Sequence, residues 1–326
     1  YSYDNTVVNN TVNGKPLVYL EDVNDYVVEN AGQVIAINSK NITIKDLNLS
    51  YACVGVEFWK TSNSIIANNN VSNNWQGIYL YESSSNTITN NTVSNNDAVG
   101  IYFESSSSNT ITNNTVSSND DDGIFLYSSS SNTIANNTVS NNEDGIYLGY
   151  SSNNTIANNT VSSNNYDGID LGCSSNNTIA NNNISSNNWY GIRLYKSSYN
   201  IITNNTALNN YDGIYLEASS NNTITNNTVS LNIGNGIYLY SSNNNIIYLN
   251  NFINNTDNVY SSSSTNIWNS TEKITYTYNG SQHTNYLGNY WDDYTGSDAD
   301  GDGIGDTPYI IDGDKDEYPL MKPFEH

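Results

Sequence analysis

The chain has 326 residues and a formal net charge of −23, with 32 acidic residues against nine lysines and arginines. This excess of carboxylates excludes nucleic acid as a partner, because phosphate contacts need a basic surface. No apolar run approaches the ~20 residues of a membrane-spanning helix, so no membrane span is expected. The chain starts at Tyr1 without an initiator Met, and we expect a processed or fragmentary chain.

A spacing of 22 or 23 residues organises most of the chain. Eleven residues after each repeat glycine comes an aliphatic residue, and five further comes another apolar one, as at Gly77, Ile88 and Val93. These offsets are constant through nine repeats, which indicates stacked, equivalent coils. The repeat glycines are Gly55, Gly77, Gly100, Gly123, Gly145, Gly168, Gly191, Gly213 and Gly236.

Each repeat contains three short runs in which apolar and polar residues alternate, for example 77–80, 86–89 and 91–94. Alternation with a period of two is typical of strands with one buried face. Three strands per 22–23-residue coil predict an all-β, right-handed parallel β-helix over residues 1–259. We expect Ile88, Ile111 and Ile134 to lie above one another in its core.

Asparagines two residues after these isoleucines share their parity, so we expect them to point inward and form a hydrogen-bonded ladder. This column contains Asn90, Asn113, Asn136, Asn158, Asn181, Asn204 and Asn226. Of the sequons elsewhere, three fall in the turn before the second run and are possible glycosylation sites: Asn153, Asn176 and Asn221. Cys53 and Cys173 lie five coils apart, too far for a disulfide between them.

The residue between the two inward apolar positions of the first run is expected to face solvent. This column forms an aromatic stripe of Tyr79, Tyr102, Phe125, Tyr147, Tyr215 and Tyr238. Such a stripe can receive sugar rings or another molecule, or its rings can stabilise the strands by stacking on one another. Asp170 and Arg193 continue the column, and we expect an exposed ion pair there, although carboxylates also serve glycosidic acid/base chemistry.

After about residue 260 the period stops, and tryptophan and tyrosine become frequent. Because the end of a solenoid exposes strand edges and core, residues 260–326 are predicted to form an aromatic-rich cap. Within it, residues 298–306 place carboxylates at alternate positions between glycines, which favours a hard cation with oxygen ligands. We predict a structural Ca²⁺ site made by Asp298, Asp300, Asp302, Asp306 and the carbonyl of Ile304.

The segments 10–17 and 31–34, the Gly-Ile-x-Leu coils, and the ending 288–294, 302–309 and 318–321 together resemble the NosD-type parallel β-helix family, in particular its archaeal secreted members. The resemblance implies a right-handed β-helix related in fold to pectin lyases, and an exported protein. The family's copper role transfers poorly, because copper favours imidazole and sulfur ligands. This chain offers His283, His326, Met321 and two distant cysteines.

The monotonous faces and the lack of acid/base machinery favour a non-catalytic extracellular structural protein. In this interpretation the chain is part of a cell-surface layer, sheath or filament, self-assembles as a homo-oligomer or polymer, and is stabilised by Ca²⁺. The alternative is a carbohydrate-binding or polysaccharide-cleaving β-helix protein, a lyase or hydrolase, that acts along the tyrosine stripe. Glycans would be its partners.

Overall fold

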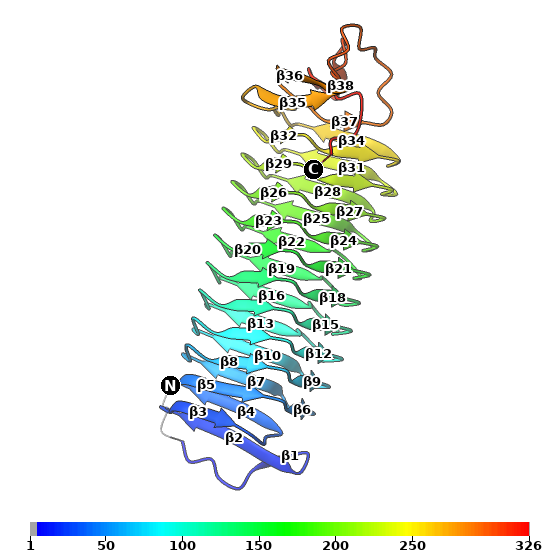
Figure 1. Cartoon of the computed structure of the whole chain (residues 1–326). Helices are drawn as coiled ribbons and strands as arrows, with labels where there is room; N and C mark the ends of the chain where they lie inside the picture. Colours follow the sequence, from blue (N-terminus) through cyan, green and yellow to red (C-terminus); the bar gives the residue numbers. More distant parts are fainter. Residues whose placement is uncertain (1–4, 326) are drawn as a thin grey trace. The chain divides into compact units, whose positions relative to one another are not determined.

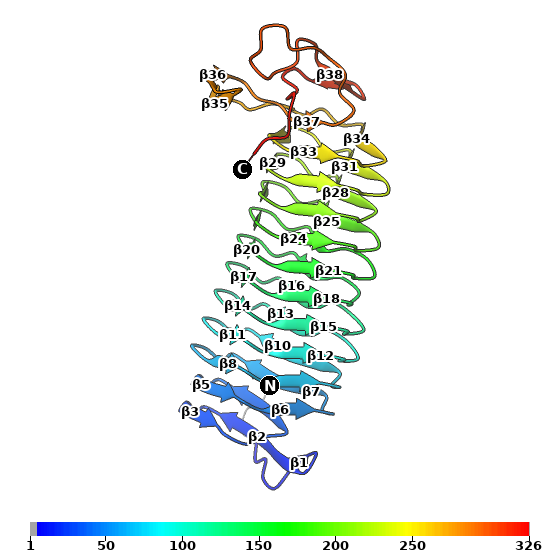
Figure 2. The same cartoon turned by 45° about the vertical axis from the view of Figure 1, so that its right-hand side comes forward.

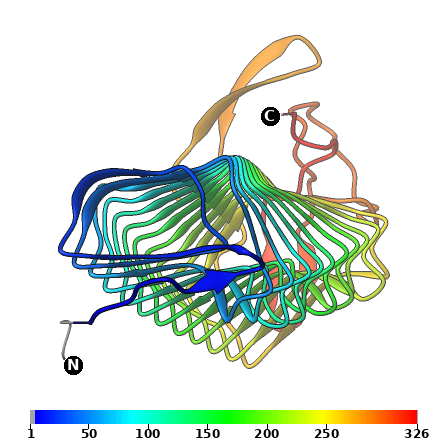
Figure 3. The ribbon, with the colours of Figure 1, turned by 90° about the horizontal axis from the view of Figure 1, so that it is seen from below.

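The computed structural model describes residues 5–325, which divide into two compact units, 5–166 and 167–325. Strands and turns build both units, and the described residues contain no helix that could cross a bilayer. In the first unit the coils stack as successive layers (Figure 1), and their outlines nest when viewed along the stack (Figure 3).

Three sheets run along the first unit, because each coil contributes one strand to each sheet. The first sheet contains β1 (Thr11–Val12), β2 (Lys15–Glu21), β4 (Gln33–Ile37), β7 (Val54–Trp59), β10 (Gln76–Tyr81), β13 (Ile101–Glu104), β16 (Ile124–Tyr127) and β19 (Ile146–Gly149). The second contains β3 (Asn24–Val28), β5 (Lys40–Lys45), β8 (Ile65–Ala67), β11 (Thr87–Thr89), β14 (Thr110–Thr112), β17 (Thr133–Ala135) and β20 (Thr155–Ala157). The third contains β6 (Asn48–Ser50), β9 (Asn70–Ser72), β12 (Thr92–Ser94), β15 (Thr115–Ser117), β18 (Thr138–Ser140) and β21 (Thr160–Ser162).

The second unit repeats this arrangement. Its first sheet contains β22 (Ile169–Gly172), β25 (Tyr190–Tyr195), β28 (Asp212–Glu217), β31 (Asn235–Tyr240) and β34 (Asp257–Ser262). Its second contains β23 (Thr178–Ala180), β26 (Ile201–Thr203), β29 (Thr223–Thr225) and β32 (Ile246–Tyr248). Its third contains β24 (Asn183–Ser185), β27 (Thr206–Leu208), β30 (Thr228–Ser230), β33 (Asn251–Ile253) and β37 (Tyr290–Trp291).

The register within the coils confirms the predicted parallel β-helix. Ile88 pairs with Ile111, and Ile111 with Ile134, in parallel strands, and all three side chains are fully buried. The repeat glycines are needed where coils approach most closely. A Cβ on Gly77 would lie 2.4 Å from the carbonyl oxygen of Gly100, so a larger residue there would force the coils apart.

The asparagine ladder lies one residue later than predicted. Asn90 and Asn136 have φ of 55° and 58° and are exposed, because they occupy left-handed corners between two strands. Such a corner breaks the two-residue alternation, so the following residue points inward. In the first unit the buried ladder at this corner consists of Asn69, Asn91, Asn114, Asn137 and Asn159.

Each ladder asparagine joins its coil to the preceding one. Asn137 Nδ2 donates to the carbonyl of Ile111 at 3.0 Å, and Asn137 Oδ1 accepts from the backbone N–H of Asn114 at 2.9 Å. The second unit continues the pattern with Asn205, Asn227 and Asn250. These bonds satisfy buried backbone groups at the corners that the sheets leave without partners.

Residues beyond β34 cover the last coil of the second unit. A hairpin of β35 (Ile274–Tyr278) and β36 (Ser281–Asn285) extends sideways from the coils, and β38 (Tyr309–Ile311) pairs with β39 (Asp314–Asp316) (Figure 2). Trp291 in β37 stacks on Phe252 at 4.5 Å and on Tyr309 at 4.5 Å, so aromatic rings close the core. The division of the chain at residue 259 into repeat and cap stays a prediction.

Candidate functional site

The predicted aromatic stripe lies along the first sheet of each unit, and its rings stack face to face. In the first unit the centroids of Tyr79, Tyr102, Phe125 and Tyr147 are 5.1, 5.0 and 4.8 Å apart in turn. Register explains the spacing, because these residues are direct partners in parallel strands. The ring faces therefore contact one another, which leaves the ring edges and hydroxyls toward solvent.

In the second unit the stack includes two residues that the sequence pattern did not identify. Tyr190 stacks on Tyr215 at 4.2 Å, Tyr215 on Tyr238 at 4.9 Å, and Tyr238 on Tyr260 at 4.7 Å. Tyr190 begins β25 three residues before Arg193, which holds the stripe position of that strand. The sequence feature that could have indicated this is the arginine in the stripe column. At this position most other coils have an aromatic residue, so the arginine leaves space for a neighbouring ring.

Carboxylates accept hydrogen bonds from hydroxyl groups along the stripe. Tyr79 donates to Glu104 at 2.8 Å, and Tyr215 donates to Glu217 at 3.1 Å. Burial, followed by hydrogen bonding and charge from Glu104, raises the pKa of the Tyr79 hydroxyl. The Tyr79 hydroxyl consequently remains a neutral hydrogen-bonding group over the physiological range. The role of the stripe as a binding surface stays a prediction.

Asp170 and Arg193 pair as the column predicts, but the carboxylate is not exposed. Arg193 Nη1 donates to Asp170 Oδ2 at 2.8 Å, and the Asp170 residue is only 4% exposed. Burial raises the pKa of the Asp170 carboxyl to about 6, although Arg193 acts in the opposite direction. The other oxygen, Oδ1, is buried without a hydrogen-bond partner. The expected exposed ion pair is therefore a largely buried carboxylate under a partly exposed guanidinium.

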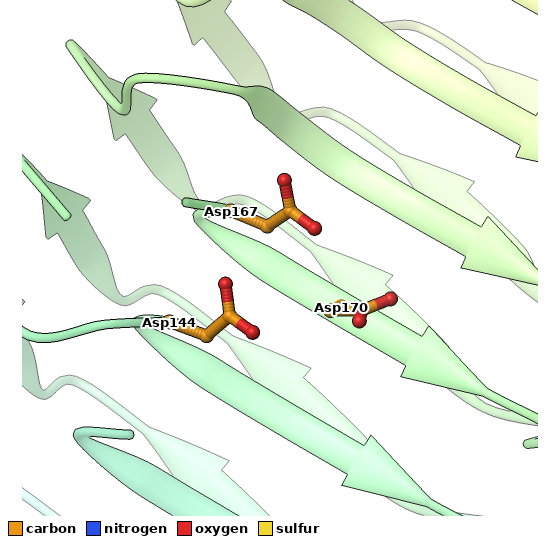
Figure 4. A group of neighbouring side chains, drawn as sticks. All are labelled: Asp144, Asp167 and Asp170. Atoms are coloured by element: carbon orange, nitrogen blue, oxygen red, sulfur yellow. The ribbon is translucent and has the colours of Figure 1, made fainter. Parts of the chain in front are cut away.

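Asp167 adds a second carboxylate to this cluster (Figure 4). Its carboxylate oxygen lies within 4.8 Å of an oxygen of Asp170, and Arg193 Nε is 4.0 Å from Asp167 Oδ2. Asp167 Oδ1 also accepts the backbone N–H of Tyr190 at 3.0 Å, which fixes the start of β25. One guanidinium thus faces two carboxylates, and these two ion pairs hold Arg193 against the sheet.

Asp212 occupies the same turn position as Asp167 two coils further on, and Tyr190 holds that position in the coil between them. It is 2% exposed and accepts from Asn235 Nδ2 at 2.9 Å. Burial raises the pKa of its carboxyl, whereas the bonds from Asn235 lower it. Asp167, Asp170 and Asp212 are therefore all buried, and each supports the backbone or a side chain of its neighbours.

The predicted cation loop brings together three of its five ligands. Carboxylate oxygens of Asp298, Asp300 and Asp302 lie within 4.8 Å of one another. Asp306 accepts from the hydroxyl of Ser297 and the N–H of Ala299, the two residues that flank Asp298. Ile304 has a buried side chain in the small core of the cap, which anchors the loop. The acidic groups of a metal site are present, and the identity of the ion is not established.

A hollow of about 590 Å³ lies beside this loop in the cap. Tyr276 and Tyr278 of the hairpin, Gly303 of the loop and Phe324 of the terminal segment are among its lining residues. The Tyr276 hydroxyl donates to the carbonyl of Asp302 at 2.9 Å. The hairpin and the acidic loop are thus held together directly.

The remaining residues of interest do not form a shared site. Cys53 and Cys173 are free thiols in different units. Asn153, Asn176 and Asn221 are exposed left-handed corner residues, with φ of 57° to 60°. Their side chains are therefore accessible, and glycosylation there stays a prediction.

The fold and these surfaces define a parallel β-helix protein with polar, aromatic faces. A family model described as "Periplasmic copper-binding protein (NosD)" matches residues 1–161 and 133–296. The chain therefore belongs to the NosD family. No curated protein matches the sequence.

Solved structures share the fold at low identity. A double mutant of the periplasmic alginate epimerase AlgG superposes with a TM-score of 0.60 and 20% identity, and covers 71% of this chain. The chain spans 62% of the length of that epimerase. The A-module of the Azotobacter vinelandii mannuronan C-5 epimerase AlgE6 gives a TM-score of 0.59 and 16% identity, with 78% of this chain and 90% of the module covered.

These comparisons correct the main functional interpretation of the sequence. We expected a non-catalytic structural protein of a surface layer, sheath or filament, but the similar structures are named as enzymes of polysaccharides. The error arose because uniform faces were attributed to self-assembly, although a long sheet with repeated side chains equally suits a polymeric ligand.

The copper named in the family description does not fit the described side chains. Copper sites favour imidazole, thiolate and thioether ligands. Among residues 5–325, the groups of three or more metal-type side chains consist of carboxylates. His283 stacks on Tyr276 at 5.6 Å within the hairpin, and His326 lies outside the described residues.

Proposed function

We propose that the chain is an exported polysaccharide-binding protein, and that the first sheet of its second unit is the binding face. The family description and the AlgG structure are both named as periplasmic, which supports a location outside the cytoplasm and is compatible with the cell surface. The fold supports the ligand class, because the similar structures are named as alginate and mannuronan epimerases.

The observation that carries this proposal is the row of hydroxyl edges at strand spacing. Tyr215, Tyr238 and Tyr260 are stacked 4.7 to 4.9 Å apart, so their polar edges recur at nearly constant intervals. A polysaccharide presents hydroxyls at regular intervals, and tyrosine can both donate to them and accept from them. A long, repetitive face also contacts several sugars at once, so weak individual contacts add up.

The buried state of the carboxylates favours binding over cleavage. Glycosidic acid/base catalysis needs two carboxyl groups on either side of the scissile bond. Asp167 and Asp170 are 3% and 4% exposed and both serve Arg193. They lie below the surface that a polymer would contact, and their arrangement is suited to hold Arg193 and Tyr190 in place.

Affinity electrophoresis of the full chain through gels that contain single polysaccharides tests this proposal. We expect retardation by at least one polysaccharide, and weaker retardation of Tyr238→Phe, which removes one hydroxyl but preserves the stacked ring. Tyr102→Phe provides the matched control in the first unit. A lack of retardation by every polysaccharide would refute the proposed function. Turnover that is abolished by Asp170→Ala would instead show an enzyme.

A second role is the binding of structural Ca²⁺ by the acidic loop. The proposal is supported by the closeness of Asp298, Asp300 and Asp302 and by the oxygen-only character of this group, which suits Ca²⁺. An ion there would stabilise the cap through Ile304 and the bond from Tyr276 to Asp302. Thermal unfolding with Ca²⁺ and with chelator measures this, and Asp298→Asn should abolish the difference.

Glycosylation of the exposed corner asparagines is a further proposal. Asn153, Asn176 and Asn221 stand at the surface of their coils, where a glycan would not disturb the core. Intact mass of the natively produced protein, measured before and after enzymatic glycan release, tests it. Equal masses would refute glycosylation.

A further inference from the structure

The first sheet of the second unit is bordered by an exposed apolar ridge that the predicted stripe does not include. The ridge consists of Trp189, Tyr211 and Ile233, which are 53%, 51% and 69% exposed. Trp189 and Tyr211 each stand two residues before a repeat glycine, and the N–H of Tyr211 donates to the carbonyl of Trp189 at 2.7 Å. The two aromatic residues therefore occupy equivalent places in adjacent coils.

The ridge is joined to the tyrosine stripe. Trp189 lies edge-on to Tyr190, with ring centroids 6.0 Å apart, and Tyr190 begins the stack of the second unit. Tyr211 packs beside Gly234, where a Cβ would come within 3.2 Å of the Tyr211 ring and 2.5 Å of Asp212. Glycine at this position thus permits the tyrosine side chain to lie against the turn of the next coil.

The ridge and the stripe offer different chemistry to a polymer. The stripe rings are stacked on one another, so the stripe presents edges and hydroxyls. Trp189 and Tyr211 are about half exposed and present apolar ring surface. Sugar rings have apolar C–H faces and polar rims, and an exposed aromatic side chain beside hydroxyl donors matches both parts.

The charge of the same face opposes an anionic polymer. Asp167, Asp170, Asp212 and Glu217 lie in or beside strands β22 to β28, whereas the nearby cations are Arg193 and Lys196. Arg193 is committed to Asp170 and Asp167, and Lys196 lies over the ring of Tyr195 at 4.8 Å. The whole chain carries −23, so repulsion from it adds to this local excess of carboxylates.

We propose that the ridge of Trp189 and Tyr211 is a binding site for an uncharged polysaccharide, which stacks there while its hydroxyls meet the tyrosine edges. This inference rests on the proposed function and narrows its ligand class. A uronic acid polymer would bring one carboxylate per sugar to a face whose guanidinium is already paired. A neutral glycan meets no such penalty and can use the carboxylate of Glu217 as a hydrogen-bond acceptor.

Affinity electrophoresis with four named polymers tests the inference on the full chain. The uncharged probes are hydroxyethylcellulose and glucomannan, and the anionic probes are alginate and polygalacturonate. Each gel is run with chelator and again with Ca²⁺, because a divalent ion can bridge two carboxylates. We expect retardation by an uncharged probe and at least tenfold weaker affinity for both anionic ones.

Three single variants locate the site. Trp189→Ala and Tyr211→Ala should each weaken retardation about tenfold, as the loss of an exposed aromatic contact does at other interfaces. Trp75→Ala is the matched control, because Trp75 also stands two residues before a repeat glycine and is 57% exposed, but lies in the first unit. It should bind as the parent does. Far-UV circular dichroism establishes that all three variants are folded.

The outcomes separate this inference from the proposed function. Tight binding of alginate or polygalacturonate, with or without Ca²⁺, would overturn the inference and leave the proposed function intact. Binding of an uncharged probe that neither Trp189→Ala nor Tyr211→Ala weakens would remove the ridge as the site. Absence of retardation by all four polymers would overturn the inference, and extending that absence to every other polysaccharide would overturn the proposed function.

Discussion

Substitution of a single ladder asparagine tests directly whether the ladder hydrogen bonds stabilise the stacked coils. In Asn137→Ala, the backbone N–H of Asn114 loses its acceptor at 2.9 Å, and the carbonyl of Ile111 loses a donor at 3.0 Å. Both groups are inside the coil stack, where an unsatisfied polar group costs about 1–3 kcal/mol. We therefore expect the free energy of unfolding to fall by roughly 2–4 kcal/mol, although a change of one side chain removes only a few atoms.

The neighbouring residue supplies the control. Asn136 is exposed, has φ of 58°, and is the residue that simple alternation assigns to the ladder. Asn136→Gly should change stability by less than about 0.5 kcal/mol, because glycine adopts the left-handed conformation readily. The pair thus differs by one position in sequence and by several kcal/mol in expected effect.

Urea unfolding followed by circular dichroism gives the global effect of both variants. Amide hydrogen exchange shows where the chain is destabilised, because coils that contact the substituted coil open more readily than distant coils. Exchange should accelerate around residues 111–137 in Asn137→Ala. A large loss of stability in Asn136→Gly together with no loss in Asn137→Ala would refute the reasoning. It would mean that the exposed column of Asn136, and not the buried one of Asn137, links the coils.

Three further predictions concern packing, pH and metal. Gly213→Ala should lower the free energy of unfolding by about 2–4 kcal/mol, because its Cβ would lie 2.2 Å from Val229 Cγ1. Gly280→Ala has open space around its Cβ and should cost only about 1 kcal/mol for its φ of 84°. Equal losses of stability in urea unfolding would contradict this prediction. The folded-state pKa of Asp170 is about 6, above the unfolded value near 3.8, so its contribution makes the protein less stable as pH rises from about 4 to 6. Asp170→Asn should therefore gain up to about 3 kcal/mol relative to the parent between pH 4 and pH 7, and a pH-independent difference would argue against a raised pKa. Ca²⁺ at about 100 times its dissociation constant should stabilise the cap by about 2.7 kcal/mol. Asp298→Asn should lose this stabilisation, whereas Asp97→Asn, a change of an exposed residue in the first unit, should keep it. Identical stabilisation of both variants would exclude the loop as the Ca²⁺ site.

The repeat period was sufficient to predict the core, because stacking requires equal offsets. Ile88, Ile111 and Ile134 are partners as expected, and so are Asp170 and Arg193. The ladder was misplaced because alternation holds only within a strand, and a left-handed corner shifts its phase. The Asn-Asn pairs carried this information, since asparagine is among the few residues that adopt left-handed backbone easily.

The candidate site was less accessible from sequence. The stripe was identified by spacing, but its stacking depends on side-chain orientation, and Tyr190 enters the stack from outside the predicted column. The burial of Asp170 depends on what surrounds it, which an alternating pattern does not specify. Asp306 also matched the spacing of a cation loop; its carboxylate accepts from Ser297 and Ala299, and its role as a ligand stays a prediction.

The ladder of the second unit ends on a different chemical group from those before it. Asn250 donates to Asn289, and Asn289 then donates to Asp316, whose carboxylate also accepts from Trp291 Nε1 at 3.0 Å. An asparagine side chain continues the series of hydrogen bonds because its amide both donates and accepts, whereas an ionised carboxylate only accepts. Asp316 therefore ends the ladder, because its carboxylate accepts from Asn289, Trp291 and Tyr318 and has no N–H to donate to a further coil.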